Sequence, residues 1–260
     1  DYFDLTRAYG SLDQAMARVQ SRFLVISFSS DWLFPARQSR EIVNALLRAG
    51  KDVSYCNIEC PYGHDSFLLE SKVQGALIRG FLSETHARIQ GRGKEKRPAP
   101  VGPLSRRQPA SGQARMSIFS GERVDHRKIA QLIEPDSSVL DLGCGDGQLL
   151  VLLGREKNTR GLGVTLGQED VQKCIERGVS VVQYDLETDL EVFADDSFDY
   201  VVLSQTLQVI RRPAAVLREM LRIGKQVIVS FPNFAYWRGR MQIMFKGRAP
   251  VFESLPYQWY

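Results

Sequence analysis

An aspartate and a histidine follow two successive apolar stretches, where neighbouring strands of a parallel sheet would end. The stretch 23–28 runs into Asp31, and the stretch 53–58 leads into a loop that holds His64. Reactive groups of parallel sheets gather beyond the carboxyl ends of the strands, so the two side chains can meet. A carboxylate then holds the imidazole in one tautomer and stabilises its cation, as in a Ser-Asp-His triad. A helix cap for Asp31 and an exposed loop position for His64 remain alternatives at this point.

The phrases SSDWLFP and YGHDSFLLE around these residues are specific. They resemble the C-terminal end of the homoserine O-acyltransferases (the MetX family), over about residues 1 to 85. The resemblance implies an α/β-hydrolase fold that moves an acyl group from acetyl-CoA or succinyl-CoA to the hydroxyl of homoserine through an acyl-serine. It further implies that Asp31 is the triad acid, that His64 is the general base and that Asp65 contacts the substrate amine. A homodimer formed through this part is also implied.

The serine of such a triad has no candidate, because no G-x-S-x-G pattern occurs in the 260 residues. An acyl-serine mechanism needs both its nucleophile and an oxyanion hole. We therefore expect a fragment, truncated at both ends, whose parent carries the serine upstream. These 260 residues alone are expected to transfer no acyl group.

A second chemical motif is an acidic, glycine-rich turn after the apolar stretch 138–142. Asp141 ends that stretch, and Gly143, Gly145 and Gly147 follow before a helical pattern that begins at Gln148. Glycines allow positive φ and a close approach of the backbone to a ligand. The pattern differs from G-x-G-x-x-G and lacks the GK[ST] of a P-loop. The acid suits a hydroxyl-bearing or cationic ligand, and a purely structural turn is the alternative.

Residues 116 to 260 resemble the MetW family, whose fold is that of the class I S-adenosylmethionine (SAM) methyltransferases. The matching phrases include VLDLGCGDGQLL, DDSFDYVVLSQTLQ and VSFPNF. The resemblance implies SAM contacts at Asp141, Gly143, Gly145, Thr165, Asp185 and Ser204. Thr165 stands where such folds have an acid for the ribose hydroxyls, which weakens SAM binding by about 1.5 to 3 kcal/mol. A methyltransferase of a small molecule and a non-catalytic module that supports the acyltransferase both remain open.

The two parts are separated by a basic stretch rich in Gly, Pro and Ser. Residues 88–115 hold eight basic residues and one acid, so this stretch carries +7 of a chain whose net charge is +4. We interpret it as a linker between a unit at 1–87 and a unit at 116–260, and not as a nucleic-acid site, because no aromatic side chains are interleaved for stacking. Apolar patterns predict strands at 23–28, 53–58, 138–142, 161–166, 179–184, 198–204 and 225–231, and helices at about 12–20, 36–49 and 66–82.

Composition limits the remaining classes of protein. The chain is 43% hydrophobic and 25% charged, which is ordinary for a globular protein. Four cysteines without a C-x-x-C pair argue against a disulfide scaffold or a zinc ribbon, so we expect no metal. No apolar run reaches the length of a membrane span. We therefore expect an α/β protein of the cytoplasm, with no membrane or nucleic-acid partner.

Overall fold

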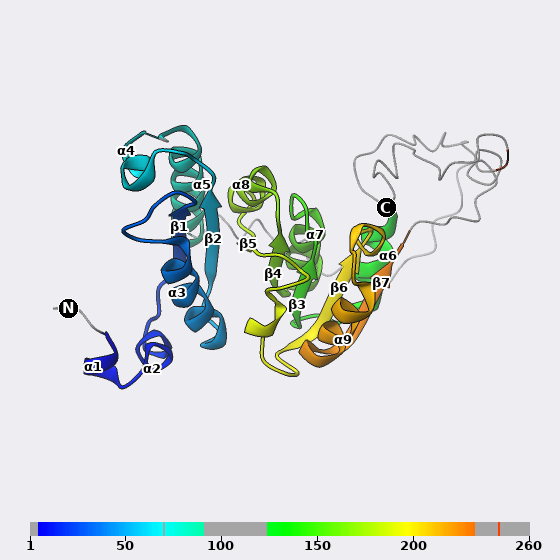
Figure 1. The fold of residues 1–260 in the computed structure, drawn as a ribbon. Coiled ribbons are helices and arrows are strands. Elements are labelled where there is room, and N and C mark those ends of the chain that lie inside the picture. Colours follow the sequence, from blue (N-terminus) through cyan, green and yellow to red (C-terminus); the bar gives the residue numbers. More distant parts are fainter. Residues whose placement is uncertain (1–4, 70, 91–123, 232–243, 245–260) are drawn as a thin grey trace.

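The computed structural model describes residues 5–69, 71–90, 124–231 and 244, and it is built around one parallel sheet (Figure 1). The sheet has seven strands in the order β1-β2-β5-β4-β3-β6-β7. The strands are β1 (Phe23–Phe28), β2 (Val53–Ile58), β3 (Ser138–Leu142), β4 (Arg160–Thr165), β5 (Ser180–Gln183), β6 (Phe198–Ser204) and β7 (Gly224–Ser230). Each end lies within one residue of the range predicted from the apolar patterns, which confirms the α/β fold class.

Helices cover both faces of this sheet. They are α1 (Leu5–Tyr9), α2 (Leu12–Ala17), α3 (Ala36–Arg48), α4 (Ser66–Leu69), α5 (Ser71–Ile89), α6 (Val124–Leu132), α7 (Gln148–Lys157), α8 (Gln168–Glu176) and α9 (Pro213–Ile223), with single 3-10 turns η1 (Gly63–Asp65), η2 (Leu190–Val192) and η3 (Leu207–Val209). Apolar side chains of α2, α3 and α9 form one buried layer, and those of α5, α6, α7 and α8 form the other. Helix α3 buries one stripe, in which Val43 and Leu46 stand at a spacing of three residues.

Both buried layers run without a break across two segments that are distant in the sequence. We call residues 5–90 the N-terminal segment and residues 124–231 the C-terminal segment. Strand β2 of the first lies parallel to β5 of the second, with Tyr55 opposite Val182. The sequence predicted a separate unit on each side of a linker, whereas the described parts of the chain share one sheet and one pair of apolar layers. Edge strands of two units can join in this way because each offers a row of unpaired backbone groups.

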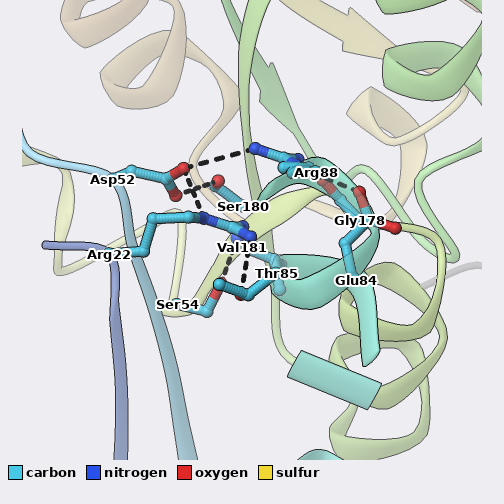
Figure 2. A network of polar contacts seen from close by, with 9 residues as sticks. All are labelled: Arg22, Asp52, Ser54, Glu84, Thr85, Arg88, Gly178, Ser180 and Val181. Atoms are coloured by element: carbon cyan, nitrogen blue, oxygen red, sulfur yellow. Dashed lines mark hydrogen bonds and ion pairs between the residues drawn. The ribbon is translucent and has the colours of Figure 1, made fainter. Parts of the chain in front are cut away.

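A network of polar contacts lies at the start of strands β2 and β5, where the N-terminal and C-terminal segments join; we call this junction the β2–β5 seam (Figure 2). Asp52, just before β2, accepts a hydrogen bond from the Ser180 hydroxyl and pairs with Arg22 at 2.7 Å and with Arg88 at 3.6 Å. Arg88 also donates to the carbonyl oxygen of Gly178 in the C-terminal segment. The carboxylate of Asp52 thus contacts two arginines of the N-terminal segment and a hydroxyl group of the C-terminal segment.

The position of Arg88 corrects the start of the expected linker. Helix α5 continues through Ile89, and Arg88 pairs with Glu84 one turn earlier at 2.9 Å. Its contacts to Glu84 and Asp52 keep this basic residue in the folded unit, and the helix ends two residues after the predicted end of that unit at 87. The rest of that stretch, 91–115, lies outside the described residues, as does most of the chain after 231. Among the helices that the structure describes, none combines the length and apolar character needed to cross a membrane.

Substituting Gly80 with Leu is expected to loosen the seam, because α5 and α8 pack closely at this glycine. A Cβ atom at Gly80 would lie 3.2 Å from Cγ of Glu176 and 3.5 Å from its backbone Cα. A larger side chain must push the helices apart, at a cost of about 1 to 3 kcal/mol. We expect a fall of several degrees in Tm, measured by differential scanning calorimetry of the 260-residue chain.

The matched control is Gly75→Leu in the same helix, where the nearest atoms to an added Cβ all belong to the flexible side chain of Arg79. Both substitutions replace a helical glycine by the same residue, so they gain equal helix propensity. Equal Tm values for the two variants would show that α5 does not pack on α8.

Candidate functional site

The structure brings Asp31 and His64 together. Asp31 lies just past β1 and His64 lies in η1, after β2. The Nδ1 atom of His64 is 3.2 Å from each carboxylate oxygen of Asp31. Because the ionised carboxylate can only accept, Nδ1 carries the proton and Nε2 keeps its lone pair in the neutral ring. This is the arrangement in which an imidazole can serve as a general base.

The turn after β1 holds the carboxylate in place. Oδ1 of Asp31 accepts hydrogen bonds from the backbone N–H groups of Leu33 (3.0 Å) and Phe34 (2.9 Å). The Phe34 N–H is the main reason why the pKa of Asp31 lies below its ordinary value; the partial burial of the carboxylate opposes this, and the bonds from His64 and Leu33 add to it. The carboxylate therefore stays ionised beside the imidazole.

A turn and two aromatic rings surround the pair. Helix α3 has Pro35 at its N-cap, so Asp31 caps the preceding turn and not that helix. The ring of His64 lies between Phe34 and Phe67, with centroid distances of 5.4 and 5.6 Å. Its side chain is 31% exposed, so a partner molecule can reach it. Asp65, the expected contact of the substrate amine, is exposed in the same turn.

The glycine-rich loop after β3 has the backbone conformation expected from its sequence. Gly143, Gly145 and Gly147 have φ values of 73°, 52° and 77°. A Cβ atom at Gly143 would lie 2.5 Å from the hydroxyl oxygen of Thr206, whereas one at Gly145 would meet nothing within 4 Å. Gly143 is therefore required by packing, while Gly145 leaves open space above the backbone. That space fits the close approach of a ligand, next to the buried Asp141.

Contacts to α8 and its C-terminal end hold this loop. Arg177 pairs with Asp146 at 2.7 Å, and the thiol of Cys174 donates to the carbonyl oxygen of Gly145 at 3.2 Å. The hydrogen bond between Cys144 and Cys174 and the desolvation of the Cys144 thiol raise the pKa of that thiol well above its ordinary value. Cys144 packs as a small side chain beside Cys174 and Gly163. Neither Arg177 nor Cys174 has a sequence pattern that links it to the loop.

Three further residues that we expected to contact SAM lie at the carboxyl ends of β4, β5 and β6. Thr165 ends β4 and is 7% exposed, Asp185 follows β5, and Ser204 ends β6. The strand order β5-β4-β3-β6 places these residues and Asp141 at one edge of the sheet. The hydroxyl of Ser204 donates to Asp125 of α6 at 3.4 Å, a neighbour that sequence reasoning did not find.

The Asp31–His64 pair lies at the same edge of the sheet, because β1 and β2 run parallel to the other strands. Neighbouring strands are about 4.8 Å apart, so the turn that follows β5 is next to the loop that follows β2. Both candidate sites therefore lie at the same edge of the sheet, one after β1 and β2 and the other after β3, β4, β5 and β6. In the described ranges, no three His, Cys, Asp or Glu side chains gather as metal ligands would.

Comparison with protein families decides the membership of the chain. The family model "Methionine biosynthesis protein MetW" matches residues 123–260, more than half of the sequence. The chain belongs to the MetW family. The part that precedes the MetW match is similar to homoserine O-acyltransferases, as its motifs indicated.

Individual relatives show how the two parts combine. The chain is 40% identical to the bifunctional methionine biosynthesis protein MetXA/MetW of Rhodopirellula baltica, over 96% of this chain and 38% of that protein. It is 54% identical to a homoserine O-acetyltransferase of Methanohalobium evestigatum over 33% of this chain and 17% of that protein. A homoserine O-succinyltransferase of Bordetella pertussis is 49% identical over 31% and 20% of the respective chains. The chain thus spans well under half the length of these relatives.

Solved structures of methyltransferases are also similar to part of this chain. A SAM dependent methyltransferase from Archaeoglobus fulgidus covers 50% of this chain and 61% of its own, with a TM-score of 0.42 and 21% identity. The relation to methionine biosynthesis therefore comes from the MetW family and from the bifunctional relative.

Proposed function

We propose that this chain is part of a protein that transfers an acyl group from acyl-CoA to the hydroxyl of homoserine. The contact between Asp31 and His64 carries this proposal, because it supplies an oriented base at the edge of the sheet. His64 takes the proton of the nucleophilic serine and passes it to the departing CoA thiolate, and it then takes the proton of the homoserine hydroxyl and returns it to the serine as the acyl group is transferred. Asp31 stabilises the imidazolium that forms each time. Asp65, which is exposed in the same turn, is the proposed contact of the substrate amine. The homodimer implied by the resemblance stays part of the proposal.

No G-x-S-x-G pattern occurs in the 260 residues, which span 38% of the bifunctional relative, so the proposal assigns the serine and the oxyanion hole to other residues of the parent protein. Relatives with either acyl donor in their names match the same segment with similar identity, 54% and 49%, so this segment does not decide between acetyl-CoA and succinyl-CoA.

The test is the formation of O-acylhomoserine, followed by mass spectrometry. Full-length protein is incubated with homoserine and either acetyl-CoA or succinyl-CoA, and the 260-residue chain is assayed in parallel. We expect product from the full-length protein with one of the two donors and none from the 260-residue chain. Product from the shorter chain, or no product with either donor, would refute the proposal.

We also propose that the MetW part binds SAM at the edge formed by the ends of β3, β4, β5 and β6. The open space at Gly145 and the acids at 141 and 185 fit such a ligand, whereas Thr165 offers one hydroxyl in place of a carboxylate. When bound, SAM would supply an electrophilic methyl group. A module that supports the acyltransferase without its own chemistry is the alternative, and the neutral Thr165 favours it.

A further inference from the structure

The turn after β5 carries Asp185, the expected contact of the adenine, and one carboxylate holds this turn together. The backbone N–H of Asp185 donates to Oδ2 of Asp189 at 2.8 Å, and the N–H of Asp189 donates back to the Asp185 carbonyl at 2.9 Å. Oδ1 of Asp185 accepts from the Glu187 N–H at 2.8 Å. The orientation of Asp185 therefore depends on where the Asp189 carboxylate lies.

The cation that fixes this carboxylate comes from the other segment. Arg40 of α3 pairs with Oδ1 of Asp189 at 2.5 Å, where the Asp189 side chain is 17% exposed. The guanidinium also lies over the ring of Tyr184, 4.8 Å from its centroid. Partial burial has the largest single effect on the pKa of Arg40 and lowers it, but the hydrogen bond and charge of Asp189, with smaller contributions from Tyr184 and Tyr55, together raise this pKa above its ordinary value. The Arg40 side chain is 38% exposed, and Asp189 and the ring of Tyr184 hold its guanidinium from two sides.

A second residue of α3, Asn44, contacts the same turn. The hydroxyl of the buried Tyr184 donates to Oδ1 of Asn44, and the ring of Tyr184 meets Tyr55 of β2 edge-on at 6.0 Å. Asn44 lies four residues after Arg40, so both side chains project from one face of the helix. Helix α3 therefore contacts the turn that carries Asp185 on both sides, at Tyr184 and at Asp189.

We propose that Arg40 is a positioning residue for the SAM site of the MetW part, so that the acyltransferase-like segment completes that site. The MetW family match begins at residue 123, and Arg40 lies far outside it. The inference rests on the proposed binding of SAM. It predicts that the site is weakened when the contact from α3 is lost, although Arg40 does not touch the ligand.

The experiment compares Arg40→Ala, Arg40→Gln and Arg40→Lys with the matched control Arg37→Ala. Arg37 is in the same helix, its side chain is 89% exposed, and it pairs only with Glu41 among the residues described. SAM affinity is measured by calorimetry on the 260-residue chain, and amide exchange of peptides covering 184–189 is measured by mass spectrometry without ligand.

We expect Arg40→Ala to weaken SAM binding about tenfold and to speed exchange in 184–189, as the loss of a charged hydrogen bond would do. Arg40→Gln keeps the stem of the side chain and should show the same loss, so it serves if the alanine variant fails to fold. Arg40→Lys should recover part of the affinity, and Arg37→Ala should match the wild type in both measurements.

The two readouts separate this inference from the proposed function. If the wild type binds no SAM but Arg40→Gln speeds exchange in 184–189, the SAM proposal fails while the role of Arg40 in holding the turn stands. Wild-type exchange in 184–189 for both Arg40→Ala and Arg40→Gln would overturn the inference, whether or not SAM binds.

Discussion

Full-length protein with His64 replaced by Ala is expected to lose acyl transfer by a factor of about 10² to 10⁴, the usual contribution of a general base. The loss should fall on kcat, because His64 moves protons in the reaction. Asp31→Asn should cause a loss of similar size, since an amide can present its N–H to Nδ1 and favour the wrong tautomer. Initial rates with homoserine and the active acyl-CoA give both values.

His86→Ala is the matched control for this experiment. His86 is exposed on α5, and its ring contacts Gln90, just after the end of that helix, at 3.3 Å. The His86→Ala protein should keep the wild-type rate. A His64→Ala protein that folds normally and retains more than about a tenth of the wild-type kcat would contradict the role of His64, because a general base contributes more than that.

Replacing Thr165 with Asp is expected to tighten SAM binding about tenfold or more. A carboxylate at the end of β4 can accept from both ribose hydroxyls, and hydrogen bonds to a charged group are worth about 1.5 to 3 kcal/mol. Because Thr165 is 7% exposed, the added charge should lower the Tm of the free chain, and bound SAM should restore part of it. Calorimetric titration of the 260-residue chain measures the change in Kd.

Leu166→Asp tests whether charge alone explains a gain. Leu166 is the next residue and is 63% exposed, so the same acid there points away from the row of strand ends. Its Kd should equal that of the wild type. If Thr165→Asp folds and binds SAM no more tightly than Leu166→Asp, position 165 does not face the ribose.

Much of the fold follows from local patterns in the sequence. The strands are short runs rich in β-branched or apolar residues, and all seven lie within one residue of their predicted ranges. The meeting of Asp31 and His64 was also predictable, because the topology of parallel strands places both at one edge. The glycine loop followed from the conformational freedom that Gly143 and Gly145 allow.

The joining of the two segments was not predictable in this way. Register at the seam depends on backbone groups and on amide and hydroxyl side chains, as where Asn57 N–H donates to Oε1 of Gln183 at 2.7 Å. Such residues carry no periodic signal, and any edge strand offers the same backbone groups. The same holds for Arg40, whose partner Asp189 is distant in sequence and becomes a neighbour only once β2 and β5 are paired.

The central claim is that the sheet edge with Asp141, Gly145 and Asp185 is a SAM site, held in part by the acyltransferase-like segment. Calorimetric titration of SAM into the 260-residue chain tests it most directly. The account predicts heat that saturates at one site per chain, with an affinity reduced by Thr165. No heat at any accessible SAM concentration would contradict it and would leave the MetW part as a supporting module without a cofactor.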